Sequence, residues 1–246
     1  QQNRLTPDRA DLSGTQIPSE AVYLCDEQTG DWFSPCYDPL KDRTAAHEAA
    51  FSLDGSAVFK MRKGGIETAL SVHVPLDEPA GVYILKIRNT GAAPRRLRVA
   101  PYFQIALAHS PEQAGALLIS RDAASGALYF ENPRNRFRTG VCFAAMSAPV
   151  KQFTTRRDRF FGAGRGFSKP VFVETGLPAP AAADGFPVAA MLATVEIPAG
   201  GEQIISIVLG EADCRKQAEA CVEKFRTVET AELSLQSTRD WWMALQ

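Results

Sequence analysis

Histidines and carboxylates are the first side chains in this sequence that could transfer protons. His47, His73 and His109 are the only histidines, and a histidine paired with a carboxylate is a common arrangement for acid–base catalysis. His73 stands inside a strand-like apolar run, and His109 follows another apolar segment. Ordinary positions in a β-sheet therefore explain both residues, since a general base is identified by its geometry before its residue type.

Glu131 and Asp158 are the acids nearest to suggestive sequence. Cleavage of a glycosidic bond needs a positioned carboxylic acid, and sequence alone does not bring two separated acids to one bond. The sequence also has no Gly-x-Ser-x-Gly elbow, no His-Glu-x-x-His motif and no paired-cysteine ligand set. We therefore expect no catalytic residue, no cofactor and no metal site in this segment.

Arginine and glycine gather in the weakly patterned stretch from Thr155 to Pro187. It contains a glycine-rich run at 162–166 and four arginines, Arg156, Arg157, Arg159 and Arg165. The run lacks the lysine and hydroxyl residue of a phosphate-binding loop, and Val171–Val173 behind it predicts a strand. We expect long loops here, and two interpretations stay open: recognition of sugar or phosphate, or a solvated surface loop.

Aromatic pairs offer a second kind of sugar contact, because pyranose rings stack on aromatic faces. The two pairs are Trp32 with Phe33 and Tyr102 with Phe103. Aromatic side chains mostly enter folds for the apolar area they bury. We favour the sheet core for both pairs.

The five cysteines are odd in number, and none is spaced as a structural zinc site requires. We interpret them as reduced thiols, which favours a cytoplasmic location. Cys214 and Cys221 are seven residues apart in a helical pattern, so they should share one buried face.

Charge and hydropathy exclude two classes of partner. The 246 residues carry 27 basic and 28 acidic side chains, so the chain lacks the positive field that attracts nucleic acid. No apolar run approaches the roughly 20 residues that span a bilayer, and the first residues lack the pattern of a secretory signal. We expect a soluble segment without membrane contact of its own.

The elements that must position these residues are mainly strands. Strand-length apolar runs separated by turn residues continue to about residue 210; they are Ala21–Leu24, Ala57–Met61, Glu67–Val74, Val82–Arg88, Arg96–Gln104 and Ile204–Leu209. Leu117–Ile119 and Ala127–Phe130 bracket a further hairpin. In 83–88 the alternation turns Tyr83, Leu85 and Ile87 inward and Lys86 and Arg88 to water. The strands are too closely spaced for helical crossovers, which predicts an antiparallel fold.

Near residue 211 the hydrophobic period changes to that of amphipathic helices. One stripe contains Cys214, Ala218, Cys221, Val222 and Phe225, and a second contains Val228, Ala231, Leu235, Trp242 and Leu245. Trp241 and Trp242 present large apolar surface near the end of the second stripe. Two such helices need a surface to pack against.

Several segments together resemble glycoside hydrolase family 94, formerly glycosyltransferase family 36. The resemblance is carried by Arg4–Pro7 (RLTP), Ala21–Pro35 (AVYLCDEQTGDWFSP) and Phe160–Pro170 (FFGAGRGFSKP), and it extends to Leu85–Thr90, Ser125–Leu128 and Asn132–Pro133. Each motif is modest, but their order is specific. The family contains cellobiose, chitobiose and cellodextrin phosphorylases and the C-terminal region of cyclic β-1,2-glucan synthetases, which the opening RLTP resembles most.

The resemblance implies a β super-sandwich of the galactose mutarotase type at 1–210. Residues 211–246 would begin a helical linker to an (α/α)6 barrel, outside this chain, that holds the general acid and the phosphate site. By the same resemblance the loop around Arg165, Gly166 and Phe167 binds substrate and reaches the sugar site of a partner subunit. The family often has tyrosine at the position of Phe167, so one hydroxyl donor is lost here.

The expected partners are therefore a glucan or oligosaccharide, inorganic phosphate through the parent's barrel, and a second subunit in a homodimer. The parent would lie in the cytoplasm or at the cytoplasmic side of the inner membrane. Two alternatives stay open: a free-standing sugar epimerase of the mutarotase-like type that uses the histidines, and a purely structural spacer domain.

Overall fold

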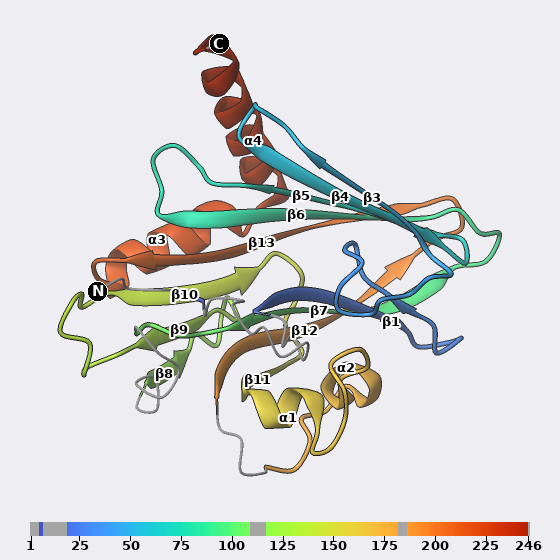
Figure 1. Cartoon of the computed structure of the whole chain (residues 1–246), viewed down its shortest axis with the longest axis horizontal. Helices are drawn as coiled ribbons and strands as arrows, with labels where there is room; N and C mark the ends of the chain where they lie inside the picture. The colour runs from blue at the N-terminus through green and yellow to red at the C-terminus, as the bar shows by residue number, and fades with distance from the viewer. Residues whose placement is uncertain (1–4, 7–18, 109–116, 182–185, 246) are drawn as a thin grey trace.

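The computed structural model describes residues 5–6, 19–108, 117–181 and 186–245, which form two antiparallel sheets packed face to face (Figure 1). The smaller sheet has five strands in these residues. Their order is β11 (Gln152–Arg156), β12 (Pro187–Ile197), β7 (Arg95–Gln104), β1 (Glu20–Asp26) and β2 (Trp32–Phe33).

The larger sheet has eight described strands and contains most of the predicted meander. Their order is β3 (Ala46–Phe51), β4 (Ser56–Lys63), β5 (Ile66–His73), β6 (Ala80–Asn89), β13 (Glu202–Ala212), β10 (Val141–Met146), β9 (Leu128–Glu131) and β8 (Leu118–Arg121). Strands β8 and β9 form the hairpin that was expected around Arg121–Gly126. The mainly β, two-sheet architecture predicted from the sequence is confirmed.

The main core lies between the two sheets, and strand alternation fills it. Leu24 from β1, Val99 from β7 and Met191 from β12 face Leu85 and Ile207 of the larger sheet. On β6, Leu85 and Ile87 are buried whereas Lys86 and Arg88 are exposed, as the alternation predicted. Aliphatic side chains on facing pleats supply most of the favourable free energy of such a sandwich.

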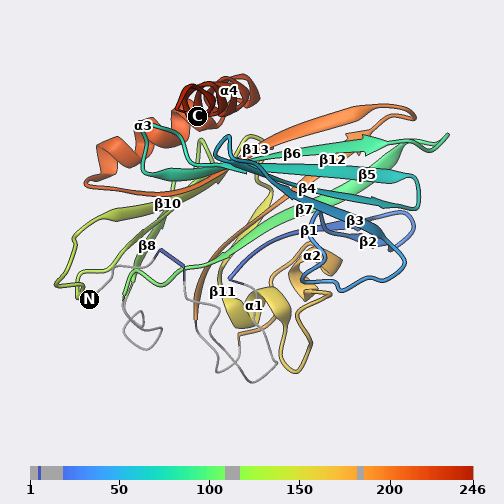
Figure 2. The same ribbon diagram turned by 45° about the horizontal axis from the view of Figure 1, so that its top comes forward.

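Two helices cover part of the outer face of the larger sheet (Figures 1 and 2). They are α3 (Arg215–Phe225) and α4 (Val228–Ala244). Val222 and Phe225 of α3 and Leu235 of α4 pack on Val82 and Val208 in a second apolar cluster. The apolar stripes of the two predicted helices therefore pack against the outer face of the larger sheet.

The second stripe is buried only in its first half. Trp241, Trp242 and Leu245 are 45%, 42% and 62% exposed. The indole of Trp242 still rests beside Gly55 in the β3–β4 turn, where a β-carbon would lie 2.3 Å from that ring. The C-terminal part of α4 therefore touches the sheet along one edge and presents apolar surface elsewhere.

His73 sits beneath α4 on the outer face of β5. Its Nε2 lies 3.1 Å from the Ser234 hydroxyl, and the side chain is 2% exposed. Arg239 of α4 pairs with Asp54 at 3.2 Å and also reaches Ser56, so a positive charge is fixed nearby. Burial, helped by the Arg239 charge, lowers the pKa of His73 from its ordinary 6.5 to about 4.

We predict that His73 makes folding sensitive to acid. The unfolded chain takes up a proton on this residue below pH 6.5 and the folded chain only near pH 4, so its contribution to stability is full above pH 6.5 and falls between pH 6.5 and 4. The loss is at most about 3 kcal/mol. In urea unfolding across this range, His73→Gln should remove that part of the pH dependence, and His47→Gln should retain it. If the free energy of unfolding depended on pH equally in the wild type, His73→Gln and His47→Gln, the assignment to His73 would be contradicted.

Two short helices cover the outer face of the smaller sheet: α1 (Arg157–Phe161) and α2 (Val171–Thr175). The strand predicted at Val171–Val173 was wrong, because this segment is α2. Phe172 and Val173 pack into an aromatic cluster on the sheet, and the Arg98 guanidinium of β7 donates to the carbonyls of Val173 and Glu174. These tertiary contacts outweigh the strand preference of valine and phenylalanine.

The long loops expected over 155–187 are thus partly helical, although residues 182–185 lie outside the described part.

The prediction that Cys214 and Cys221 share a buried face was half wrong. Cys221 is buried, but Cys214 is exposed because it precedes the first turn of α3 rather than lying within it. None of the five cysteines takes part in a disulfide bond. The two aromatic pairs, Trp32–Phe33 and Tyr102–Phe103, belong to the core, as favoured.

Candidate functional site

The α1–α2 loop, residues 162–170, contains the three residues expected to bind substrate. It is anchored by aromatic rings that precede it. Phe160 and Phe161 lie against Tyr102 of β7 with ring centroids 4.7 and 5.1 Å apart, and Phe160 is fully buried. Since both ends of the loop enter short helices fixed on the sheet, the sheet positions the loop.

Phe167 and Tyr23 fix the far side of this loop. The Phe167 ring meets Phe161 edge-on at 5.0 Å, and its carbonyl accepts a 2.8 Å hydrogen bond from the Tyr23 hydroxyl of β1. Burial raises the pKa of Tyr23 well above its ordinary value, so the phenol remains a donor at neutral pH. Phe167 is half-buried and leaves part of its surface for a ligand.

Arg165 is an exposed cation near the middle of the loop. Its side chain is 48% exposed and pairs with the Glu174 carboxylate of α2. An ion pair this exposed contributes little to stability, so a ligand can compete for the guanidinium at small cost. Gly162 has a φ of 85°, and a β-carbon there would lie 2.7 Å from Val171, so glycine is required at the turn into the loop. Gly166 is exposed next to Arg165.

The other three arginines of this region have structural contacts. Arg156 forms a two-pronged pair with the buried Asp158, at 3.0 and 2.7 Å. Arg157 stacks over the Phe186 ring at 4.3 Å, and Arg159 donates to the Ala179 carbonyl at 3.1 Å. Among the four, Arg165 is therefore the one best placed to meet a ligand.

A polar pocket of about 300 Å³ adjoins the end of the α1–α2 loop. Ser168 and Lys169 line one side. The other lining residues come from the β1–β2 turn and β2, from the β2–β3 connection and from β4; they include Asp31, Trp32, Asp42 and Lys63. The Lys63 ammonium lies 2.7 Å from the Asp42 carboxylate. This hydrogen bond, with others from Thr44, lowers the pKa of Asp42 well below its usual range. Sequence reasoning missed this pocket because four separate segments of the chain build it.

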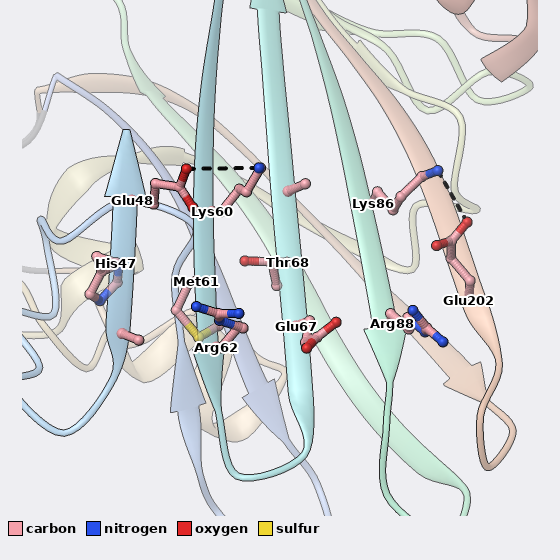
Figure 3. Close-up of a pocket in the computed structure, with 12 residues that line it drawn as sticks. His47, Glu48, Lys60, Met61, Arg62, Glu67, Thr68, Lys86, Arg88 and Glu202 are labelled. Atoms are coloured by element: carbon pink, nitrogen blue, oxygen red, sulfur yellow. Dashed lines mark ion pairs between the residues drawn. The ribbon is translucent and has the colours of Figure 1, made fainter. Parts of the chain in front are cut away.

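A second hollow lies on the outer face of the larger sheet, beside the part that α3 and α4 cover. It has a volume of about 310 Å³. Figure 3 shows Arg62, Glu67 and Arg88 side by side on β4, β5 and β6, with Lys60 and Lys86 one step further along their strands. We call this hollow the outer groove.

The two described histidines do not converge. His73 lies on the outer face of β5, whereas His47 lies on the inner side of β3, where its ring packs edge-on against Tyr37 at 5.7 Å. His109 falls outside the described residues. Glu131 ends β9 in the larger sheet, and Asp158 is in α1 on the smaller sheet, so these acids do not converge either. Within the described ranges no cluster of histidine, cysteine and carboxylate could hold a metal ion.

Two antiparallel sheets packed face to face, with helices on both outer faces, define a β super-sandwich. The family profile of the Glycosyl hydrolase 94 supersandwich domain matches residues 1–228. The chain therefore belongs to this family, as the sequence motifs indicated.

Two relatives are similar to the chain in sequence, and a solved structure shares its fold. The chain is 27% identical over 230 residues to the cyclic beta-(1,2)-glucan synthase NdvB of Rhizobium meliloti (strain 1021), covering 92% of this chain and 8% of that protein. It is 25% identical over 227 residues to the 3-O-beta-D-glucopyranosyl-beta-D-glucuronide phosphorylase of Paenibacillus borealis, covering 89% of this chain and 29% of that one. A bacterial glucoamylase complexed with acarbose shares the fold, with a TM-score of 0.55, 8% identity, and coverage of 92% and 31%.

The chain thus spans less than a third of the length of these relatives. In the described part of the chain, no helix has both the length and the apolar character needed to cross a membrane.

Proposed function

We propose that this chain is the non-catalytic β super-sandwich region of a larger phosphorylase-like or glucan-synthase-like protein, and that its α1–α2 loop helps to hold a glucan or oligosaccharide. The observation that carries the proposal is the exposed Arg165, held by a loop anchored on the sheet through Phe160, Phe161 and Tyr23. A fixed loop loses little conformational entropy when a ligand binds.

The chemistry of the loop and its pocket suits sugar hydroxyls. The Arg165 guanidinium donates several hydrogen bonds in one plane, to hydroxyl oxygens or to phosphate. Asp31 and Asp42 supply acceptors for hydroxyl protons, Ser168 and Lys169 supply donors, and Phe167 offers an apolar edge. Neighbouring donors and acceptors are what the vicinal hydroxyls of a saccharide need.

The remaining parts of the proposal concern the parent protein. Bond making and breaking, and the binding of inorganic phosphate, would take place in a separate catalytic region. Residues 211–246 would begin the helical connection to it, and the exposed end of α4 would pack against it through Trp241, Met243 and Leu245. In a dimer the α1–α2 loop would reach a sugar held by the partner subunit, which the exposure of Arg165 and Gly166 allows.

Calorimetric titration with a β-1,2-linked gluco-oligosaccharide tests the role of the loop. We expect measurable binding that Arg165→Ala weakens about tenfold or more, since a hydrogen bond to a charged group contributes about 1.5–3 kcal/mol. Glu174→Gln keeps the guanidinium but removes its ion-pair partner, so affinity should be maintained or improved. Arg134→Ala removes an exposed arginine elsewhere and serves as the control. Absence of binding, or equal affinities for wild type and Arg165→Ala, would refute the proposal.

A further inference from the structure

We propose that the outer groove is a second binding site, for a saccharide that carries a carboxylate or phosphate group. It lies on the outer face of the larger sheet, whereas the α1–α2 loop lies over the outer face of the smaller sheet (Figures 1 and 2). The two sites therefore do not share residues, and the outer groove does not depend on the role proposed for the loop.

The strand register creates the groove. Ala69 of β5 pairs with Lys60 on β4 and with Lys86 on β6. These three side chains point to the same face, so a single methyl group stands between two long side chains. Ala69 is thus the floor, and the lysine stems are the walls.

Lys60 and Lys86 each form an ion pair with a carboxylate from the next strand outward. Lys60 lies 4.0 Å from Glu48 of β3, and Lys86 lies 3.3 Å from Glu202 of β13. Figure 3 shows Lys86 turned towards Glu202, away from β5, whereas the Lys60 ammonium lies on the β5 side of β4 and its ion pair with Glu48 crosses that strand. The two lysine side chains are about half exposed, at 54% and 46%. The groove is therefore open to solvent and edged by two ammonium groups.

Arg62 and Arg88 flank Glu67 across neighbouring strands. In the described part of the chain, neither guanidinium group forms an ion pair with a carboxylate, Glu67 included. Both side chains are exposed. An arginine without a carboxylate partner keeps its planar fork of donors available for a bidentate oxyanion.

The charges together define the ligand class. Four cations surround the groove, and Lys60 and Lys86 already have carboxylates beside them, so the free positive charge is on Arg62 and Arg88. Between them Glu67 accepts hydrogen bonds from hydroxyl groups and disfavours a purely anionic ligand. A molecule with one oxyanion and several hydroxyls satisfies all three residues. A volume of about 310 Å³ suits a small saccharide, since small-molecule sites measure about 300–1,000 Å³.

Amide chemical shifts in NMR titrations test this site with four probes. D-glucuronate and glucose 6-phosphate provide the two sources of oxyanion, glucose is the neutral control, and inorganic phosphate is the anion without a sugar. We expect both acidic sugars to shift amides of β4, β5 and β6, and to bind at least tenfold more tightly than glucose or inorganic phosphate. Equal binding of glucose would overturn the oxyanion assignment, and equal binding of phosphate would overturn the saccharide assignment.

Variants separate the groove from general charge effects. Arg62→Gln/Arg88→Gln removes the free guanidiniums, and Ala69→Ile fills the floor without changing charge; each should weaken glucuronate binding tenfold or more. Arg134→Gln/Arg136→Gln removes two exposed charges elsewhere, so this variant should bind glucuronate as wild type does. Undiminished glucuronate binding in the two groove variants, or no shifts in β4–β6, would overturn the proposal.

Discussion

Phe160→Ala is expected to lower the free energy of unfolding by about 3–5 kcal/mol, because it removes a fully buried aromatic ring from a packed cluster. The ring lies 5.5 Å from Tyr23, 4.7 Å from Tyr102 and 5.6 Å from Phe172. These neighbours belong to two strands and a helix, so the cavity cannot close by moving one element. Urea unfolding followed by circular dichroism measures the change.

The same substitution should loosen the α1–α2 loop, which hydrogen exchange of residues 157–176 would detect as lost protection. Phe137→Ala is the matched control, because that ring is 61% exposed and its removal should change stability by no more than about 0.5 kcal/mol. If the two variants were equally stable, the aromatic cluster would not be the anchor of the loop.

Asn89→Asp is expected to destabilise the chain by a similar amount, about 3–5 kcal/mol at neutral pH, since it places a buried charge against three carbonyl oxygens with only the Gly91 amide left to donate to it. The side-chain amide nitrogen (Nδ2) of Asn89 donates to the backbone carbonyls of Ala93, Ile197 and Pro198 at 2.8, 3.2 and 3.1 Å. The side chain has no exposed surface. It joins the β6–β7 turn to the β12–β13 turn, and each of these turns connects one sheet to the other.

A carboxylate at this position would direct negative charge at three carbonyl oxygens. Part of the lost stability should return in acid, because the protonated acid is neutral and can donate one hydrogen bond. Gln203→Glu makes the same amide-to-carboxylate change on an exposed side chain, and should alter stability by no more than about 0.5 kcal/mol. Thermal unfolding at two pH values compares the variants, and an Asn89→Asp protein as stable as Gln203→Glu would refute the role of this amide.

Strands could be predicted from the sequence wherever one face of the strand is buried and the other is exposed to solvent. The alternation at 83–88 is readable for that reason. Strands β10 and β12 have no such pattern, because they are buried on both faces and rich in alanine, and an apolar run of this kind does not distinguish strand from helix. The short helix α2 was missed because aromatic packing, rather than propensity, decides its conformation.

The candidate loop was found through family motifs, and the structure adds how it is held. Sequence spacing gave no sign of the contact between Tyr23 and Phe167, which are 144 positions apart. The outer groove was equally hidden. Lys86 and Arg88 were expected on the solvent-exposed face of their strand. The groove exists only because the strand register places Lys86 opposite Ala69 and Arg88 opposite Glu67. Chemistry that depends on register between strands is not visible in a single sequence.

An amide chemical-shift map with a β-1,2-linked gluco-oligosaccharide tests the central claim most directly. The account predicts shifts at Arg165, Gly166 and Phe167 and in the adjoining pocket around Asp31 and Asp42, with none near His47 or His73. Shifts centred on the histidines, or no shifts at any sugar concentration, would contradict a carbohydrate-binding role for the α1–α2 loop.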